Sequence, residues 1–143
     1  MALDSIYRIA GSAMTAQTVR LNTVASNLAN ADSAASSADA TYKARKPMFA
    51  AVYGNDELVR DAGMGGARVQ VLDVVTSGTE PQRRYEPNNP LANRDGYVYY
   101  PDVNEIEEMT DMMSATRSFE TSVDVLNRVR SMQQGLLKLG EQS

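Results

Sequence analysis

Cysteine, histidine and tryptophan are absent from the sequence, and phenylalanine occurs only twice. A chain without cysteine has no disulfide, no thiolate metal ligand and no cysteine nucleophile. A chain without histidine lacks the commonest general base and the commonest metal ligand. We therefore expect no enzymatic activity, no bound metal and no other cofactor.

The charge and the apolar runs argue against two further classes of protein. The formal net charge is −4, which disfavours a nucleic-acid-binding protein that works by neutralising phosphates. No stretch approaches 18 uninterrupted apolar residues, so we expect no membrane span. The first residues lack the apolar core of a secretory signal, and we expect any export to proceed without a cleavable signal peptide.

The N-terminal segment predicts one long helix, from residue 3 to about residue 30, with Asp4 or Ser5 as its cap. Two series of residues recur there at steps of seven, and interleaved they give the three-and-four spacing of a coiled-coil seam. The series are Leu3, Ala10, Gln17, Val24 and Tyr7, Met14, Leu21, Leu28, of which only Gln17 breaks the apolar pattern. A helix with such a narrow seam needs a partner helix.

The middle segment, residues 32–103, reads as short strands separated by loops. Candidate strands are Met48–Tyr53, Arg68–Val75 and Tyr97–Tyr100, the last of which follows a turn at Asp95-Gly96. The turn between the first two strands is expected at Gly63, Gly65 and Gly66. Residues 32–41 are small and have no apolar period, so we expect a loop there.

The C-terminal segment, residues 104–140, predicts a second long helix. Asn104 with Glu107 resembles a capping box, and Gly140 is the expected C-terminal stop. Two apolar stripes, offset around this helix, indicate that more than one surface covers it. The stripes are Met109, Met112, Thr116, Phe119, Val123, Leu126 and Val125, Val129, Met132, Leu136, Leu139.

We therefore predict an α+β fold with three parts. Residues 1–31 and 104–140 form terminal helices that pair as an antiparallel coiled coil, and residues 32–103 form a small β-hairpin-rich middle segment. Three polar clusters have alternative interpretations. The acidic cluster at the start of the second helix indicates a solvated helix start rather than a cation site. Its members are Glu105, Glu107, Glu108 and Asp111. The basic residues Lys43, Arg45 and Lys46 indicate a surface or subunit contact rather than a contact with a phosphate backbone. The tyrosines of residues 97–100 fit a half-exposed strand as well as a carbohydrate or interface surface.

Several stretches resemble one family of proteins. Residues 16–32, AQTVRLNTVASNLANAD, resemble the N-terminal signature of the bacterial flagellar axial proteins, which include rod, hook and hook-associated components. IAGSAMTAQ near the start, YEPNNPLANRDGYVYYPDVN (residues 85–104) and MSATRSFETSVDVLNRVRSM (residues 113–132) resemble the proximal-rod members more closely. The resemblance covers nearly the whole chain and is weakest over residues 33–83. There, SAASSADATYKAR stands where many axial proteins have a Thr-Pro-Gly-Tyr-type turn.

The resemblance implies a structural subunit of the flagellar proximal rod. Such a subunit polymerises helically through its terminal helices into a torque-transmitting drive shaft that crosses the periplasm around a central export channel. The implied partners are copies of itself, other proximal and distal rod proteins, the rod-base adaptor at the membrane ring, and the flagellar type III export apparatus. The alternative is a helical adaptor or export chaperone that forms a discrete complex with partner helices.

The assembly interface is expected along both helices. The three asparagines of the first helix would cap or bridge neighbouring helices, and the apolar residues would form the contact layer. The expected interface residues are Leu3, Tyr7, Met14, Leu21, Asn22, Val24, Asn27, Leu28, Asn30, Met109, Met112, Phe119, Val123, Leu126, Val129, Met132, Leu136 and Leu139.

Overall fold

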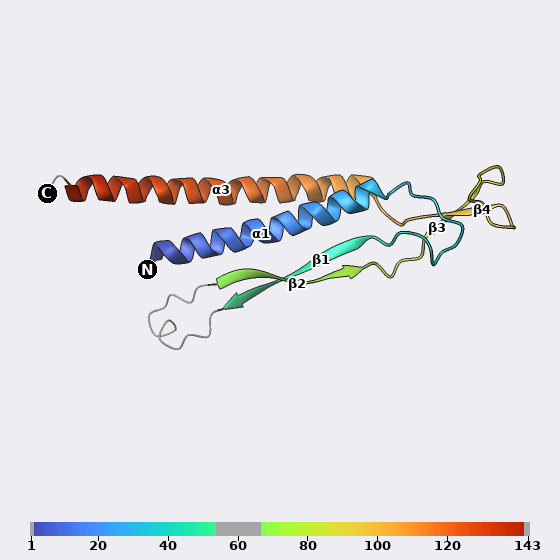
Figure 1. Ribbon diagram of the computed structural model, residues 1–143, viewed down its shortest axis with the longest axis horizontal. Coiled ribbons are helices and arrows are strands. Elements are labelled where there is room, and N and C mark those ends of the chain that lie inside the picture. The colour runs from blue at the N-terminus through green and yellow to red at the C-terminus, as the bar shows by residue number, and fades with distance from the viewer. Residues whose placement is uncertain (1, 54–66, 142–143) are drawn as a thin grey trace.

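The computed structural model describes residues 2–53 and 67–141 of the chain. Two long helices lie along the molecule, and two antiparallel strand pairs connect them (Figure 1). In chain order the elements are α1 (Ala2–Ala29), β1 (Arg45–Tyr53), β2 (Ala67–Thr76), β3 (Gln82–Tyr85), β4 (Tyr97–Tyr100) and α3 (Glu105–Glu141). The predicted α+β layout is thus present.

The two helices run antiparallel and contact one another, with the C-terminal end of α1 beside the N-terminal end of α3 (Figure 1). The Tyr7 hydroxyl donates a hydrogen bond to Gln133 Oε1 at 3.2 Å near one end of the pair. Asn27 reaches Glu108 near the other end. Whether the pair supercoils as a coiled coil stays a prediction.

The helix ends differ from the expected ones. Helix α1 already includes Ala2, so Asp4 and Ser5 lie inside its first turns instead of capping it. Gly140 does not stop α3, which runs to Glu141, because this glycine does not adopt the positive φ that ends a helix at a glycine. The predicted cap at Asn104 is confirmed, since its Oδ1 accepts from the backbone N–H of Ile106 at 3.1 Å.

Strands β1 and β2 form a hairpin-like pair on the side of α1 that faces away from α3 (Figure 1). The register shifts between Met48 and Phe49. The Ser12 hydroxyl accepts a hydrogen bond from the backbone N–H of Val69 at 3.0 Å and so fastens β2 to α1. Both strands were predicted, whereas the expected glycine turn at residues 63–66 lies outside the described residues.

Strands β3 and β4 form a second antiparallel pair beyond the helix ends, and β3 was not predicted. Arg83 stacks on the Tyr97 ring and Arg84 on the Tyr100 ring, with centroid distances of 4.5 and 4.6 Å. Gly96, which precedes β4, has φ of 80°, a conformation that favours glycine.

Buried apolar side chains in the described part of the chain are small. Five of the eight are alanines, which lets backbones approach closely and leaves most of the larger apolar residues near the surface. The eight are Ala10, Ala16, Val24, Ala31, Ala44, Val98, Ala115 and Val129. The chain therefore has a thin core along the helix pair.

Candidate assembly site

Asn27 joins three elements at one end of the helix pair. Its side chain is 1% exposed. The amide nitrogen donates to the Arg45 carbonyl at 2.8 Å and to Glu108 Oε1 at 3.0 Å. The amide oxygen accepts from the Tyr42 hydroxyl and from the Arg45 backbone N–H, both at 2.9 Å. We call Asn27, Tyr42, Arg45 and Glu108 the asparagine joint, because every hydrogen-bonding position of the amide is used.

Glu108 is the buried carboxyl group of this joint. It is 6% exposed, and burial raises its pKa above the usual value of a glutamate. The hydrogen bond from Asn27 and the charge of Lys46 partly offset that increase, while the charge of Asp111 adds to it. The joint therefore contains a carboxyl group whose charged form is disfavoured.

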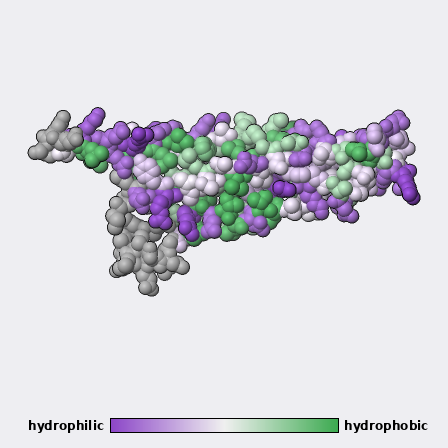
Figure 2. Space-filling model, viewed as in Figure 1, coloured by the Kyte–Doolittle hydropathy of each residue, from purple (hydrophilic) through white to green (hydrophobic). Residues whose placement is uncertain are grey.

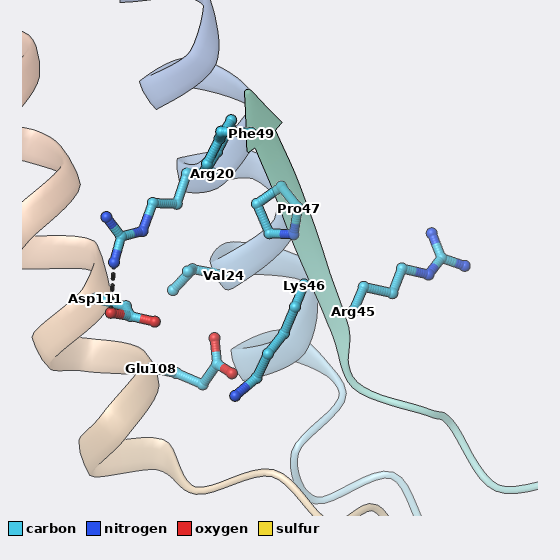
Figure 3. Close-up of a pocket in the computed structure, with 8 residues that line it drawn as sticks. All are labelled: Arg20, Val24, Arg45, Lys46, Pro47, Phe49, Glu108 and Asp111. Carbon is cyan, nitrogen blue, oxygen red and sulfur yellow. Dashed lines mark hydrogen bonds and ion pairs between the residues drawn. The ribbon is translucent and has the colours of Figure 1, made fainter. Parts of the chain in front are cut away.

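A pocket of about 320 Å³ lies beside the joint, between α1, β1 and α3 (Figure 3). Arg20 closes one side through an ion pair with Asp111, at 2.6 Å. Lys46 points toward Glu108 in Figure 3, whereas Arg45 extends away on the far side of β1. The lining residues are Arg20, Val24, Arg45, Lys46, Pro47, Phe49, Glu108 and Asp111.

The acidic start of α3 is engaged with groups of the same chain. Asp111 pairs with Arg20, Glu107 with Lys46 at 3.3 Å, and Glu108 binds Asn27. Across residues 2–53 and 67–141, no three acidic side chains are grouped so as to hold a metal ion. The carboxylates of this region thus act as partners within the fold.

The expected interface residues of α1 lie at very different depths. Val24 and Asn27 are buried, Asn22 is exposed, and Asn30 donates to the Ser26 carbonyl at 2.8 Å in the last turn of the helix. Leu3 belongs to α1, but its side chain is outside the described residues. The half-buried positions are Tyr7, Met14, Leu21 and Leu28.

The expected interface residues of α3 divide into two groups. Those that face α1 or lie beside it are at least half-buried: Met112, Phe119, Val123, Leu126 and Val129. Those left open are Met109, Met132, Leu136 and Leu139, with 53–67% of their surface exposed. Figure 2 shows hydrophobic surface at the C-terminal end of α3 and over the strand pair beside α1. Whether other subunits cover these residues stays a prediction.

Three exposed apolar residues of α3 lie outside the two predicted stripes. Ile106 is 78% exposed, Met113 is 60% exposed and Leu137 is 70% exposed. The periodicity that defines the stripes therefore gave no signal for them. Leu137 is adjacent to Leu136, and the run of three leucines within residues 136–139 was the available clue.

Comparison with known proteins places both helices in one family. A model described as flagella basal body rod protein matches residues 8–34, which contain most of α1 and Asn27. A second, described as flagellar basal body rod FlgEFG protein C-terminal, matches residues 94–139. No helix in the described ranges is long and apolar enough to cross a membrane.

Full-length relatives carry one name, flagellar basal-body rod protein FlgC. The relative from Escherichia coli O6:H1 is 45% identical over 141 residues, which span 99% of this chain and all of the relative. The relative from Salmonella typhimurium is 43% identical with the same coverage. The one from Bacillus subtilis is 29% identical and spans 93% of this chain and 95% of the relative. The chain therefore belongs to the FlgC family of flagellar basal-body rod proteins, and it is a structural protein of the flagellum and not an enzyme.

Proposed function

We propose that this protein is a subunit of the flagellar proximal rod that polymerises helically through α1 and α3. The rod would transmit torque and enclose the export channel. Family membership supports the place in the rod. The proposal of polymerisation is supported by the large apolar residues of α3 that remain exposed in the single chain. Those with more than half of their surface exposed are Ile106, Met109, Met113, Met132, Leu136, Leu137 and Leu139.

Burial of these residues between subunits would drive assembly. Removing a leucine or methionine side chain from water contributes roughly 1.5–3 kcal/mol, so even partial burial of several side chains favours association. These residues lie toward the two ends of α3, whereas α1 packs along one side of its middle and the strand pair packs on α1 instead. A contact between unlike surfaces of two copies generates a helical array when the rotation between neighbours does not close a ring.

The proposed partners are copies of the chain, other proximal and distal rod proteins, the rod-base adaptor at the membrane ring and the type III export apparatus. The proposed location is the part of the rod that crosses the periplasm, reached without a cleaved signal peptide. The names of the Escherichia coli and Salmonella relatives, which are basal-body rod proteins, support this assignment.

The test is a charged substitution on the exposed end of α3. Leu136→Glu should fold normally, because Leu136 is 62% exposed, but should abolish motility and incorporation into basal bodies. Gln134→Glu, an exposed neighbour with the same added charge, is the matched control and should keep both. Each variant replaces the native copy in a flagellated bacterium, and unfolding by urea is compared on the purified proteins.

Incorporation of Leu136→Glu into basal bodies at the normal level would contradict the proposal. So would recovery of the unaltered protein only in small soluble complexes, which is the result expected of an adaptor or export chaperone.

A further inference from the structure

Gln17 interrupts the contact between the two long helices. It lies in the seven-residue series of α1 between Ala10 and Val24, which are 7% and 3% exposed, so it belongs to the side of α1 that packs inward. Gln17 is half-buried, and its Oε1 atom is buried without a hydrogen-bond partner in residues 2–53 and 67–141. A buried acceptor without a donor has lost its hydrogen bonds to water. The paired helices therefore carry a cost that separated helices do not.

Helix α3 depends on α1 for its packing. Among the described elements, α1 alone packs against α3, whereas α1 also packs against β1 and β2. The ion pair that links α3 to β1, between Glu107 and Lys46, lies beside the asparagine joint. The hydroxyl of Ser12 holds β2 to the N-terminal half of α1 through the Val69 N–H. If the two helices part, α1 therefore keeps the strand pair, and the C-terminal half of α3 loses its packing partner.

The two ends of the helix pair are held unequally. At one end, the asparagine joint and the Arg20–Asp111 ion pair join α1 to α3. Toward the other end, the helices diverge in Figure 1, and a groove of about 270 Å³ lies between them. The groove begins on α3 at Thr121 and on α1 at Ala13, so Gln17 lies between the groove and Arg20. The helices are thus firmly joined up to Arg20 and loosely packed beyond Gln17.

We propose that Gln17 is a release point, at which α3 from Thr121 onward separates from α1 while the asparagine joint holds. Separation exposes Gln17 Oε1 to water and removes the cost of its burial. The hydrogen bond from Tyr7 to Gln133 would break, but both groups are half-buried and can bind water instead. A helix segment of this length is marginal in water without a partner, so its backbone hydrogen bonds would open as well. This inference concerns the single chain and goes beyond the proposed function.

The release point would make helix pairing respond to contacts made elsewhere. A molecule that binds only the paired form of α1 and α3 shifts the equilibrium toward that form. The cost of burying Gln17 Oε1 is small enough to be offset by such binding, because a single unsatisfied group changes an equilibrium constant by roughly 10- to 100-fold. The pair would therefore open readily in the single chain and close when added contacts favour it.

Hydrogen exchange of backbone amides in the purified full chain tests the proposal, because local separation and global unfolding expose different amides. We call residues 121–133 the separating half of α3 and read it at the amides of Leu126 and Val129. Residues 108–115 are the joint half, which is read at Met112 and Ala115. In the unaltered protein, we expect amides of the separating half to exchange at least about tenfold faster than those of the joint half.

Substitutions at Gln17 and at the joint should affect the two halves differently. Gln17→Leu replaces the amide by an apolar group of similar size, so exchange in the separating half should slow by roughly tenfold. Gln134→Leu makes the same replacement at an exposed position of α3 and is the matched control, which should leave the rate unchanged. Asn27→Ala weakens the joint, which the local separation leaves intact. It should therefore accelerate exchange in the joint half and leave the separating half unchanged.

Equal exchange of the two halves in the unaltered protein would overturn the proposal, because the helix pair would then open only as a whole. Exchange in the separating half that Gln17→Leu does not slow, or slows no more than Gln134→Leu does, would also overturn it, since the buried oxygen would not be what loosens the pair. This comparison does not require Asn27→Ala to fold. Each of these results leaves the proposed function intact, because that function is tested by incorporation into basal bodies.

Discussion

The side-chain amide of Asn27 and the carboxyl group of Glu108 meet 3.0 Å apart across the interface of the two long helices. Asn27 also holds both backbone groups of Arg45, which places the start of β1 against the same turn of α1. One buried side chain thereby fixes the relative positions of α1, β1 and α3.

Asn27→Ala removes every hydrogen bond of the joint that passes through the amide. Each buried polar group left without a partner costs about 1–3 kcal/mol, and several groups lose one here. We expect the free energy of unfolding, measured with urea, to fall by roughly 2–4 kcal/mol on this basis. Asn22→Ala, at an exposed position of the same helix, should change it by less than about 0.5 kcal/mol. Equal effects of the two substitutions would mean that the joint does not stabilise the fold.

Glu108 should make stability depend on pH. Burial holds its pKa in the folded protein above that of an ordinary glutamate, so at a pH between the folded and unfolded pKa values the folded chain binds more protons than the unfolded chain. The contribution of Glu108 is fully present below the unfolded pKa and is lost as pH rises through the folded pKa.

Glu108→Gln removes this titration and keeps an oxygen that accepts from Asn27. The free energy of unfolding of the unaltered protein, relative to that of Glu108→Gln, should therefore be greater at pH 4 than at pH 7. Glu105→Gln, which makes the same charge change at an exposed position one turn earlier, distinguishes a general effect of charge. A difference that is the same at both pH values would refute the prediction.

Gly96→Ala should weaken the β3–β4 pair. Gly96 has φ of 80°, and a Cβ atom there would lie 2.8 Å from Tyr85 Cε2 and 3.3 Å from Pro87 Cβ. Positive φ and crowding together lead us to expect a loss of about 1–3 kcal/mol. Gly78→Ala has open space around the new methyl group and should be nearly neutral. Urea unfolding monitored by tyrosine fluorescence compares the two variants, and a neutral Gly96→Ala would argue against this turn geometry.

Ser12→Ala should loosen the contact between β2 and α1. The substitution leaves the Val69 N–H without its acceptor. Loss of this hydrogen bond should lower the free energy of unfolding by about 1 kcal/mol. The exchange of the Val69 amide hydrogen should become faster. Thr15→Ala is the control, because the Thr15 hydroxyl donates to the Gly11 carbonyl of its own helix. Unchanged exchange at Val69 in Ser12→Ala would show that the hydroxyl does not hold the strand.

The periodicity of apolar residues predicted the two helices but not how deeply each side chain is buried. Val24 and Val129 are buried, whereas Leu136 and Met109 are exposed, although all four belong to predicted seams or stripes. A repeat shows which residues share a helix face. It does not show how far the partner helix extends. The N-terminal end of α1 does not reach the last turns of α3 (Figure 1).

Strand β3 was missed because its support is not local. Its sequence, Gln-Arg-Arg-Tyr, has no apolar alternation, and all four residues are exposed. It is held by pairing with β4 and by the stacking of its arginines on Tyr97 and Tyr100. The central role of Asn27 was likewise not distinguishable from that of Asn22, since the surroundings of each depend on segments far away in sequence.

The asparagine joint makes the molecule unequally stiff along its length. Near Asn27, hydrogen bonds join α1 to both α3 and β1, and the Arg20–Asp111 ion pair joins α1 to α3 a second time. Toward the opposite end, small side chains and the Tyr7–Gln133 hydrogen bond hold the helices together beside an open groove. A twisting load applied to one subunit would therefore be carried rigidly at the braced end and absorbed as bending at the other. We therefore expect the mechanical compliance to be greatest where the fewest side-chain contacts join the two helices.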